Sequence, residues 1–159
     1  MAWIFSLSME CGDDAAAAAE LTAHFESFSL EGESGESISI RGQTLLDDEG
    51  ATWVMAIPQG VSRVGIQSDA DARSMTLLGS QLYDRLRIAP RGYRFALCGI
   101  EVDGFRTCAE LLDADAIRRF RGLVVEEAIF KAVGEPPAFE PFAPGYWWLP
   151  YGGETYPPR

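Results

Sequence analysis

The chain has 159 residues, of which 47% are hydrophobic and 23% are charged. This length and composition suit one globular domain whose core needs neither disulfides nor a metal, and they exclude a wholly disordered chain. The formal charge of −11 at pH 7 disfavours nucleic-acid binding, because phosphates repel an acidic surface.

Two elements are predicted at the start of the chain. Apolar and polar residues alternate over residues 3–9, which is typical of a strand with one buried face. A helix is expected at about 13–28, because Asp13 or Asp14 can cap its N-terminus and apolar residues then recur at helical spacing. The start of the chain has no positively charged segment and no cleavage site, so we interpret it as a strand and not as a secretory signal.

Four further elements follow before residue 103. Alternating residues predict strands at about 37–41 and 51–57, joined as a hairpin with a long loop. Apolar residues at helical spacing predict an amphipathic helix at about 69–87, which Ser68 can cap. Residues 93–102 form a mostly apolar run, which is typical of a central strand.

This order of elements is β-α-β-β-α-β. It predicts an α+β fold of the ferredoxin-like type, in which an antiparallel sheet carries two helices on one face. Two short helices are expected at about 107–112 and 113–120, and residues 123–133 begin either as a strand or as a helix that ends at Gly134. We expect residues 1–133 to form a single α+β domain.

The remaining segment, residues 134–159, has a different composition. It holds seven of the nine prolines and seven of the 18 aromatic residues. Prolines exclude a regular helix or a central strand, and exposed aromatic rings are costly, so we expect this tail to wrap over the same domain. Trp147 and Trp148 point to opposite sides if the backbone is extended, so we expect one to be buried and the other to be more exposed.

Few residues offer catalytic or metal-binding chemistry. His24 is the only histidine, and the three cysteines (Cys11, Cys98 and Cys108) form no C-x-x-C pair, which disfavours a zinc site and a disulfide framework. Cys11 precedes a predicted helix N-terminus, but the surrounding acidic residues raise a thiol pKa. The carboxylate pairs lack the spacing of a calcium loop, and no glycine-rich phosphate loop occurs. We therefore expect no metal and no cofactor.

Charge is distributed unevenly along the chain. Residues 1–60 contain eleven of the 24 acidic residues and one basic residue, Arg41. Such a surface attracts a basic protein and accelerates its association. Arginines at 85, 87, 91 and 94 and at 118, 119 and 121 form local basic clusters, which pair either with an anion or with the acidic residues of the chain itself.

We predict a partner-binding role for two groups of residues. The first is acidic and comprises Glu31, Glu33, Glu36, Asp47, Asp48 and Glu49. The second is aromatic, a class enriched at interface hot spots, and comprises Tyr146, Trp147, Trp148 and Tyr151.

The profile of a small, acidic chain without a catalytic signature is typical of bacterial immunity proteins, which bind and neutralise a toxin. We therefore expect a non-catalytic cytoplasmic protein whose partner is a protein with a basic surface, and not a nucleic acid or a membrane. One alternative is a small enzyme that uses carboxylates or Cys11. Another is an accessory or oligomerisation domain of a larger assembly, in which the C-terminal aromatic residues make the contact.

Overall fold

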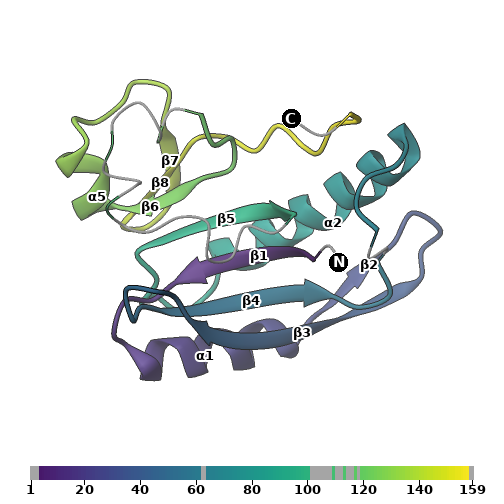
Figure 1. The fold of residues 1–159 in the computed structure, drawn as a ribbon, viewed down its shortest axis with the longest axis horizontal. Coiled ribbons are helices and arrows are strands. Elements are labelled where there is room, and N and C mark those ends of the chain that lie inside the picture. Colours follow the sequence, from purple (N-terminus) through teal and green to yellow (C-terminus); the bar gives the residue numbers. More distant parts are fainter. Residues whose placement is uncertain are drawn as a thin grey trace.

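The computed structural model describes residues 4–61, 64–100, 109, 113, 117 and 119–157. They form the expected α+β fold, built around one open, antiparallel sheet of eight strands in the order β2-β3-β4-β1-β5-β6-β8-β7 (Figure 1). The strands are β1 (Phe5–Glu10), β2 (Ser29–Glu31), β3 (Ser37–Leu46), β4 (Thr52–Pro58), β5 (Phe95–Ile100), β6 (Val124–Glu126), β7 (Glu140–Ala143) and β8 (Tyr146–Trp148). The helices are α1 (Ala15–Glu26), α2 (Asp69–Arg87) and α5 (Glu127–Ala132).

The two long helices begin at the caps that the sequence predicts. The Asp14 carboxylate accepts a hydrogen bond from the Ala17 amide (2.9 Å), and the Ser68 hydroxyl accepts one from the Asp71 amide (3.1 Å). Each side chain thereby satisfies a backbone N–H group that the first turn of a helix leaves without a partner. The bounds of α2 coincide with the predicted range of 69–87.

Both long helices pack on the same face of the sheet. One core cluster joins Leu21 of α1 and Leu82 of α2 to Leu7 and Met9 of β1. Because side chains alternate along a strand, the neighbouring residues of β1 face the opposite side. The register pairs Glu10 of β1 with Trp53 of β4 and with Phe95 of β5 on this second face.

The second face of the sheet carries a core of its own. Trp53 and Phe95 pack there with Phe130 of α5, Phe139 and Leu149. The prediction of one buried face for the first strand is therefore wrong, because every residue of β1 is buried, including Ser6, Ser8 and Glu10. The two serine hydroxyls are 2.9 Å apart and hydrogen-bond to each other.

The C-terminal segment forms two strands, which lie at the upper left of Figure 1. The expectation that it contains no central strand is wrong, because β8 pairs with β6 on one side and with β7 on the other. Residues 145–149 contain no proline, so β8 keeps its backbone donors, whereas Pro141 belongs to β7 at the edge of the sheet. This placement follows the rule that confines proline to edge strands.

The remaining predictions on the C-terminal third have mixed outcomes. Residues 123–133 combine both predicted alternatives, since strand β6 runs directly into helix α5. Gly134 follows α5 with a φ of 87°, as expected for the residue that ends a helix in the left-handed region. Most residues of the short helices predicted at about 107–112 and 113–120 lie outside the described residues. In the part of the chain that is described, no helix is long and apolar enough to cross a membrane.

Candidate functional site

The predicted acidic residues lie in two separate places. Glu31 ends β2, and Glu33 and Glu36 lie in the connection from β2 to β3, whereas Asp47, Asp48 and Glu49 form the turn that follows β3. The ten residues of β3 separate these two groups by about 30 Å at roughly 3.3 Å per residue. Figure 1 shows them at opposite ends of this strand.

The first acidic group is tied to helix α2. The Ser74 hydroxyl donates to the Glu33 carboxylate (2.7 Å), and the Gln81 side chain exchanges two hydrogen bonds of 2.8 Å with the backbone of Glu31. The Glu36 carboxylate accepts a hydrogen bond from the Ser34 amide (2.9 Å) within its own loop. All three glutamate side chains remain exposed, so the loop presents its charges on a fixed backbone.

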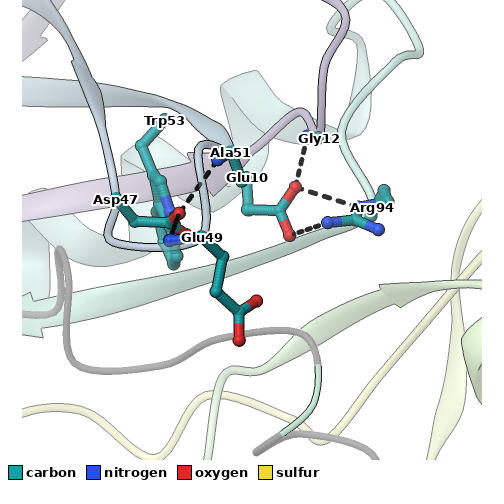
Figure 2. Close-up of polar contacts among 7 residues, drawn as sticks. All are labelled: Glu10, Gly12, Asp47, Glu49, Ala51, Trp53 and Arg94. Carbon is teal, nitrogen blue, oxygen red and sulfur yellow. Dashed lines mark hydrogen bonds and ion pairs between the residues drawn. The ribbon is translucent and has the colours of Figure 1, made fainter.

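In the second acidic group, Asp47 organises its own turn (Figure 2). Its carboxylate accepts hydrogen bonds of 2.9 Å from the Glu49 amide, the Ala51 amide and the Trp53 indole. Although slight burial raises the pKa of Asp47, these hydrogen bonds outweigh it and hold the pKa below its usual value. Asp48 and Glu49 are exposed, so they remain available to a partner, whereas Asp47 has a structural role.

Glu10 is a buried acidic residue that the sequence patterns did not single out. Its side chain is 1% exposed and faces Arg94, which precedes β5 (Figure 2). Arg94 donates from Nε to Oε1 (2.9 Å) and from Nη2 to Oε2 (2.6 Å), and the Gly12 amide also donates to Oε1. This two-bond geometry is the favoured one for an arginine and a carboxylate. No periodicity reveals it, because the partners are 84 residues apart.

Cys11 follows Glu10 in the chain and is buried. Burial and the neighbouring charges of Glu10 and Asp14 raise the pKa of the Cys11 thiol to about 12, although Arg94 opposes this shift. The thiol is therefore protonated at neutral pH, and a protonated thiol is a poor nucleophile. His24 is also structural, since its Nε2 lies 3.0 Å from the Arg85 carbonyl and its ring packs on Phe28.

The predicted aromatic residues pack against the chain itself. Tyr146 is buried, stacks on Tyr93 with ring centroids 4.2 Å apart, and donates a hydrogen bond to the Tyr93 carbonyl (2.8 Å). Tyr151 packs on Tyr83, with a centroid distance of 5.0 Å.

The two adjacent tryptophans occupy opposite faces of β8. Trp147 stacks on Phe130 at 4.3 Å, and Trp148 packs on Tyr83 at 5.4 Å and lies under the Arg87 guanidinium. The expectation that one tryptophan is buried and the other more exposed is wrong, since neither is buried and both are half-buried. Each face of β8 packs against a different core cluster, so Trp148 contacts the cluster below the two long helices and Trp147 contacts the cluster on the second face.

The structure does not join the acidic and aromatic groups into one site. β8 lies five strands from β3 in the sheet order, about 24 Å away at roughly 4.8 Å per strand. The described residues contain no group of three potential metal ligands. No protein family, no curated protein and no solved structure matches this chain in comparisons with known proteins.

Proposed function

We propose that this chain is a non-catalytic, acidic binding protein of the bacterial immunity type, which binds and neutralises a toxin with a basic surface in the cytoplasm. One observation carries the proposal: nine carboxylates between residues 13 and 49 are exposed, and none of them forms an ion pair in the described part of the chain. They are Asp13, Asp14, Glu20, Glu26, Glu31, Glu33, Glu36, Asp48 and Glu49.

Unpaired charges of one sign repel each other and lower the stability of a compact chain. A basic protein relieves this repulsion when it binds, and its long-range attraction speeds the encounter. The same field repels nucleic acids, whose binding depends on lysine and arginine. A protein partner therefore accounts for this surface better than a nucleic acid does.

Two alternatives have weaker support. An enzyme that uses Cys11 needs a thiolate, but the pKa of this thiol is raised to about 12, and the Glu10 carboxylate is occupied by Arg94. An accessory domain that binds through its aromatic tail needs free rings, but Tyr146 is buried and Trp147 is stacked on Phe130. We therefore assign the partner contact to the acidic residues and not to the tail.

We also infer that β1, β3, β4 and β5, with α1 and α2, form a ferredoxin-like unit. The support is the order β3-β4-β1-β5 within the sheet and the shared core of the two helices on one face. In this interpretation β2 extends one edge of the unit, and β6, β8 and β7 extend the other. Phe142 and Tyr146 of the tail join the same core, which supports one domain that includes residues 134–159.

The exposed carboxylates offer two docking positions. The turn patch consists of Asp13, Asp14, Asp48 and Glu49, which lie together because the Thr52 amide donates to the Gly12 carbonyl (2.7 Å). The loop patch consists of Glu31, Glu33 and Glu36. Because β3 separates the patches, variants of one patch serve as controls for the other.

The test is capture of a partner, followed by a toxicity assay. Bacterial lysate is passed over the immobilised wild-type chain, a turn-patch variant (Asp13→Asn, Asp48→Asn, Glu49→Gln) and a loop-patch variant (Glu31→Gln, Glu33→Gln, Glu36→Gln). Asp14 and Asp47 are left intact because they cap α1 and the turn. We expect a basic protein that the wild type and one patch variant retain and that the other variant loses.

A third variant (Asp84→Asn, Glu135→Gln, Glu140→Gln) removes three exposed charges outside both patches and should retain the captured protein. Expression of that protein alone should arrest bacterial growth, and co-expression of the wild-type chain should restore it. The proposal fails if the captured protein leaves growth unaffected, or if all three variants lose it equally.

A further inference from the structure

A cavity of about 720 Å³ lies where four parts of the chain meet. Its described lining includes Ile66 from the loop before α2, Ile100 from the end of β5, Arg119 and Arg121 from the segment before β6, and Glu154 from the C-terminal segment. Cavities of roughly 300–1,000 Å³ hold small-molecule ligands in other proteins. The volume therefore suits a small organic molecule and not merely a few waters.

The two arginines lie on either side of Phe120, in a turn that precedes β6. Phe120 lies between them and packs into the core of the second sheet face, whereas Arg119 and Arg121 both line the cavity. The segment is held in place at Gly122, whose amide donates to the Leu149 carbonyl (2.7 Å) and whose carbonyl accepts from the buried Tyr83 hydroxyl (2.7 Å). The backbone beside Arg121 is thus fixed before any ligand binds.

The C-terminal segment has glycine at the position where it passes the Arg121 side chain. A Cβ atom added to Gly152 would lie 3.0 Å from Cδ of Arg121, closer than an ordinary van der Waals contact. Gly153 has a φ of 82°, and a Cβ atom there would lie 2.8 Å from Thr76. The two glycines therefore allow the C-terminal segment to pass close to both the arginine and helix α2.

The charges of the cavity are not neutralised within the described residues. Neither Arg119 nor Arg121 forms an ion pair there. Glu154 accepts a hydrogen bond from the Tyr151 hydroxyl (3.0 Å), and its amide donates to Thr76 (2.8 Å). Burial raises the pKa of Glu154, although the bond from Tyr151 opposes this shift. An ionised Glu154 would repel an anion, whereas the two arginines attract one, so the arginine wall is the position for negative charge.

We propose that this cavity binds a small organic anion with an apolar body. Its carboxylate or phosphate group lies against the guanidinium groups of Arg119 and Arg121, and its apolar part contacts Ile66 and Ile100. Planar guanidinium groups match the oxygen pairs of carboxylates and phosphates, and the isoleucines gain from the burial of apolar surface. The site is independent of the acidic surface that is proposed to bind a toxin.

The probe for this site is phenyl phosphate, which combines a phosphate with an apolar ring. Isothermal titration of the full chain should show saturable, one-to-one binding with a dissociation constant below about 1 mM. Arg119→Gln and Arg121→Gln should each weaken binding by about tenfold or more, since a hydrogen bond to a charged group contributes roughly that factor. Inorganic phosphate should bind about tenfold more weakly than phenyl phosphate, because it lacks the apolar ring.

Two controls make the test specific. Arg91 is exposed and does not line the cavity, so Arg91→Gln should bind phenyl phosphate like the wild type. Gly152→Ala should weaken binding, because the new methyl group displaces the Arg121 side chain. Melting temperatures of all variants establish that each is folded. The proposal is overturned if phenyl phosphate shows no saturable binding, if Arg91→Gln loses it as Arg121→Gln does, or if inorganic phosphate binds equally well.

Discussion

At the scale of single residues, two acidic side chains with internal partners differ from the exposed ones around them. Asp47 accepts three hydrogen bonds across its turn, and Glu10 receives both donor groups of Arg94 on the second face of the sheet. Neither residue is free to bind a partner without losing these contacts. The neighbouring Asp48 and Glu49 have no such role, so substitutions of them are suitable controls for the effect of Asp47 on stability.

Asp47→Ala should destabilise the protein by about 1–3 kcal/mol, because it leaves the Trp53 indole and two amides without their acceptor. Asp48→Ala should change stability by less than about 0.5 kcal/mol, as is usual for an exposed site. Urea unfolding of the two variants provides the comparison. Equal stabilities of the two variants would contradict the structural role of Asp47.

The hydrogen bonds to Asp47 make its contribution to the free energy of unfolding depend on pH. The folded pKa of Asp47 lies below its usual value, so the ionised form is favoured in the folded state. The stabilisation is therefore present above the unfolded pKa of aspartate, near 3.9, and is lost as the pH falls through the folded pKa. The difference in the free energy of unfolding between wild type and Asp47→Ala should therefore become smaller in acid, as urea unfolding at several pH values would show.

The Glu10–Arg94 pair should respond unequally to removal of either partner. Arg94→Met leaves the buried Glu10 carboxylate without a counter-charge and should cost about 3–5 kcal/mol. Glu10→Gln should cost less, because the Arg94 side chain is 38% exposed and can be hydrated. Chemical denaturation of both single variants measures the two costs. A larger cost for Glu10→Gln would show that the arginine, and not the glutamate, depends on the pair.

At the scale of elements, the two long helices were predictable and the sheet edges were not. Helix α2 combines an N-cap at Ser68 with apolar residues at helical spacing, so its signal is local. Strand β3 was predicted at 37–41 but extends to Leu46, because residues 42–46 pair with β4 although they show no regular alternation of apolar and polar residues. Pairing with a neighbouring strand decides where such a strand ends, and one sequence does not reveal the neighbour.

The greater length of β3 also explains why the predicted acidic residues do not form one site. The acidic residues were predicted as one surface from their closeness in the sequence, but β3 separates Glu36 from Asp47. The ion pair of Glu10 with Arg94, and the cavity with Arg119 and Arg121, join residues far apart in the chain. Such contacts depend on tertiary structure, so composition and periodicity could not indicate them.

The packing of β8 predicts that its two tryptophans contribute similarly to stability. Trp147→Ala loses the stack on Phe130, and Trp148→Ala loses its contacts with Tyr83 and the Arg87 guanidinium. Removal of a fully buried tryptophan ring costs about 3–5 kcal/mol, and removal of either of these half-buried rings should cost less than that. Thermal unfolding of the two variants should give melting temperatures that lie close together and below that of the wild type. A wild-type melting temperature for either variant would identify that ring as a free contact residue.

Truncation after Gly134 should have a much larger effect. It removes β7 and β8, exposes the free edge of β6, and uncovers the aromatic rings of Phe130 and Tyr83. Unpaired edges and exposed apolar surface promote aggregation. We expect a truncated chain that is insoluble, or that binds a hydrophobic dye while it lacks near-ultraviolet circular dichroism. A truncated chain that melts like the wild type would show that the tail is a free appendage.

At the scale of the whole molecule, charge opposes folding and favours association. The formal charge is −11, and the described residues contain only two salt bridges, Glu10–Arg94 and Glu127–Lys131. The acidic surface therefore has little internal compensation. Its repulsion acts through solvent, so dissolved salt should weaken it.

The melting temperature should accordingly rise as salt increases from about 0.01 M to 0.15 M, since the Debye length falls from about 30 Å to 8 Å. A chain that carries the charge changes of both patches should melt higher at low salt and respond less to added salt. In the Asp84→Asn, Glu135→Gln, Glu140→Gln variant, the melting temperature should depend on salt more nearly as it does in the wild type. Differential scanning calorimetry measures each curve. A melting temperature that falls with salt would show that repulsion among the carboxylates does not govern the stability of the folded chain.

The central position of β1 has a consequence for synthesis on the ribosome. β1 is made before both of the strands with which it pairs, β4 and β5, and Glu10 lies opposite Phe95 in the register. At translation rates of roughly 5–20 residues per second, about 4–17 s pass between the synthesis of these two residues. Until β5 is made, a strand whose residues all become buried lacks at least one of its two neighbours, so we expect the nascent chain to be recognised by chaperones.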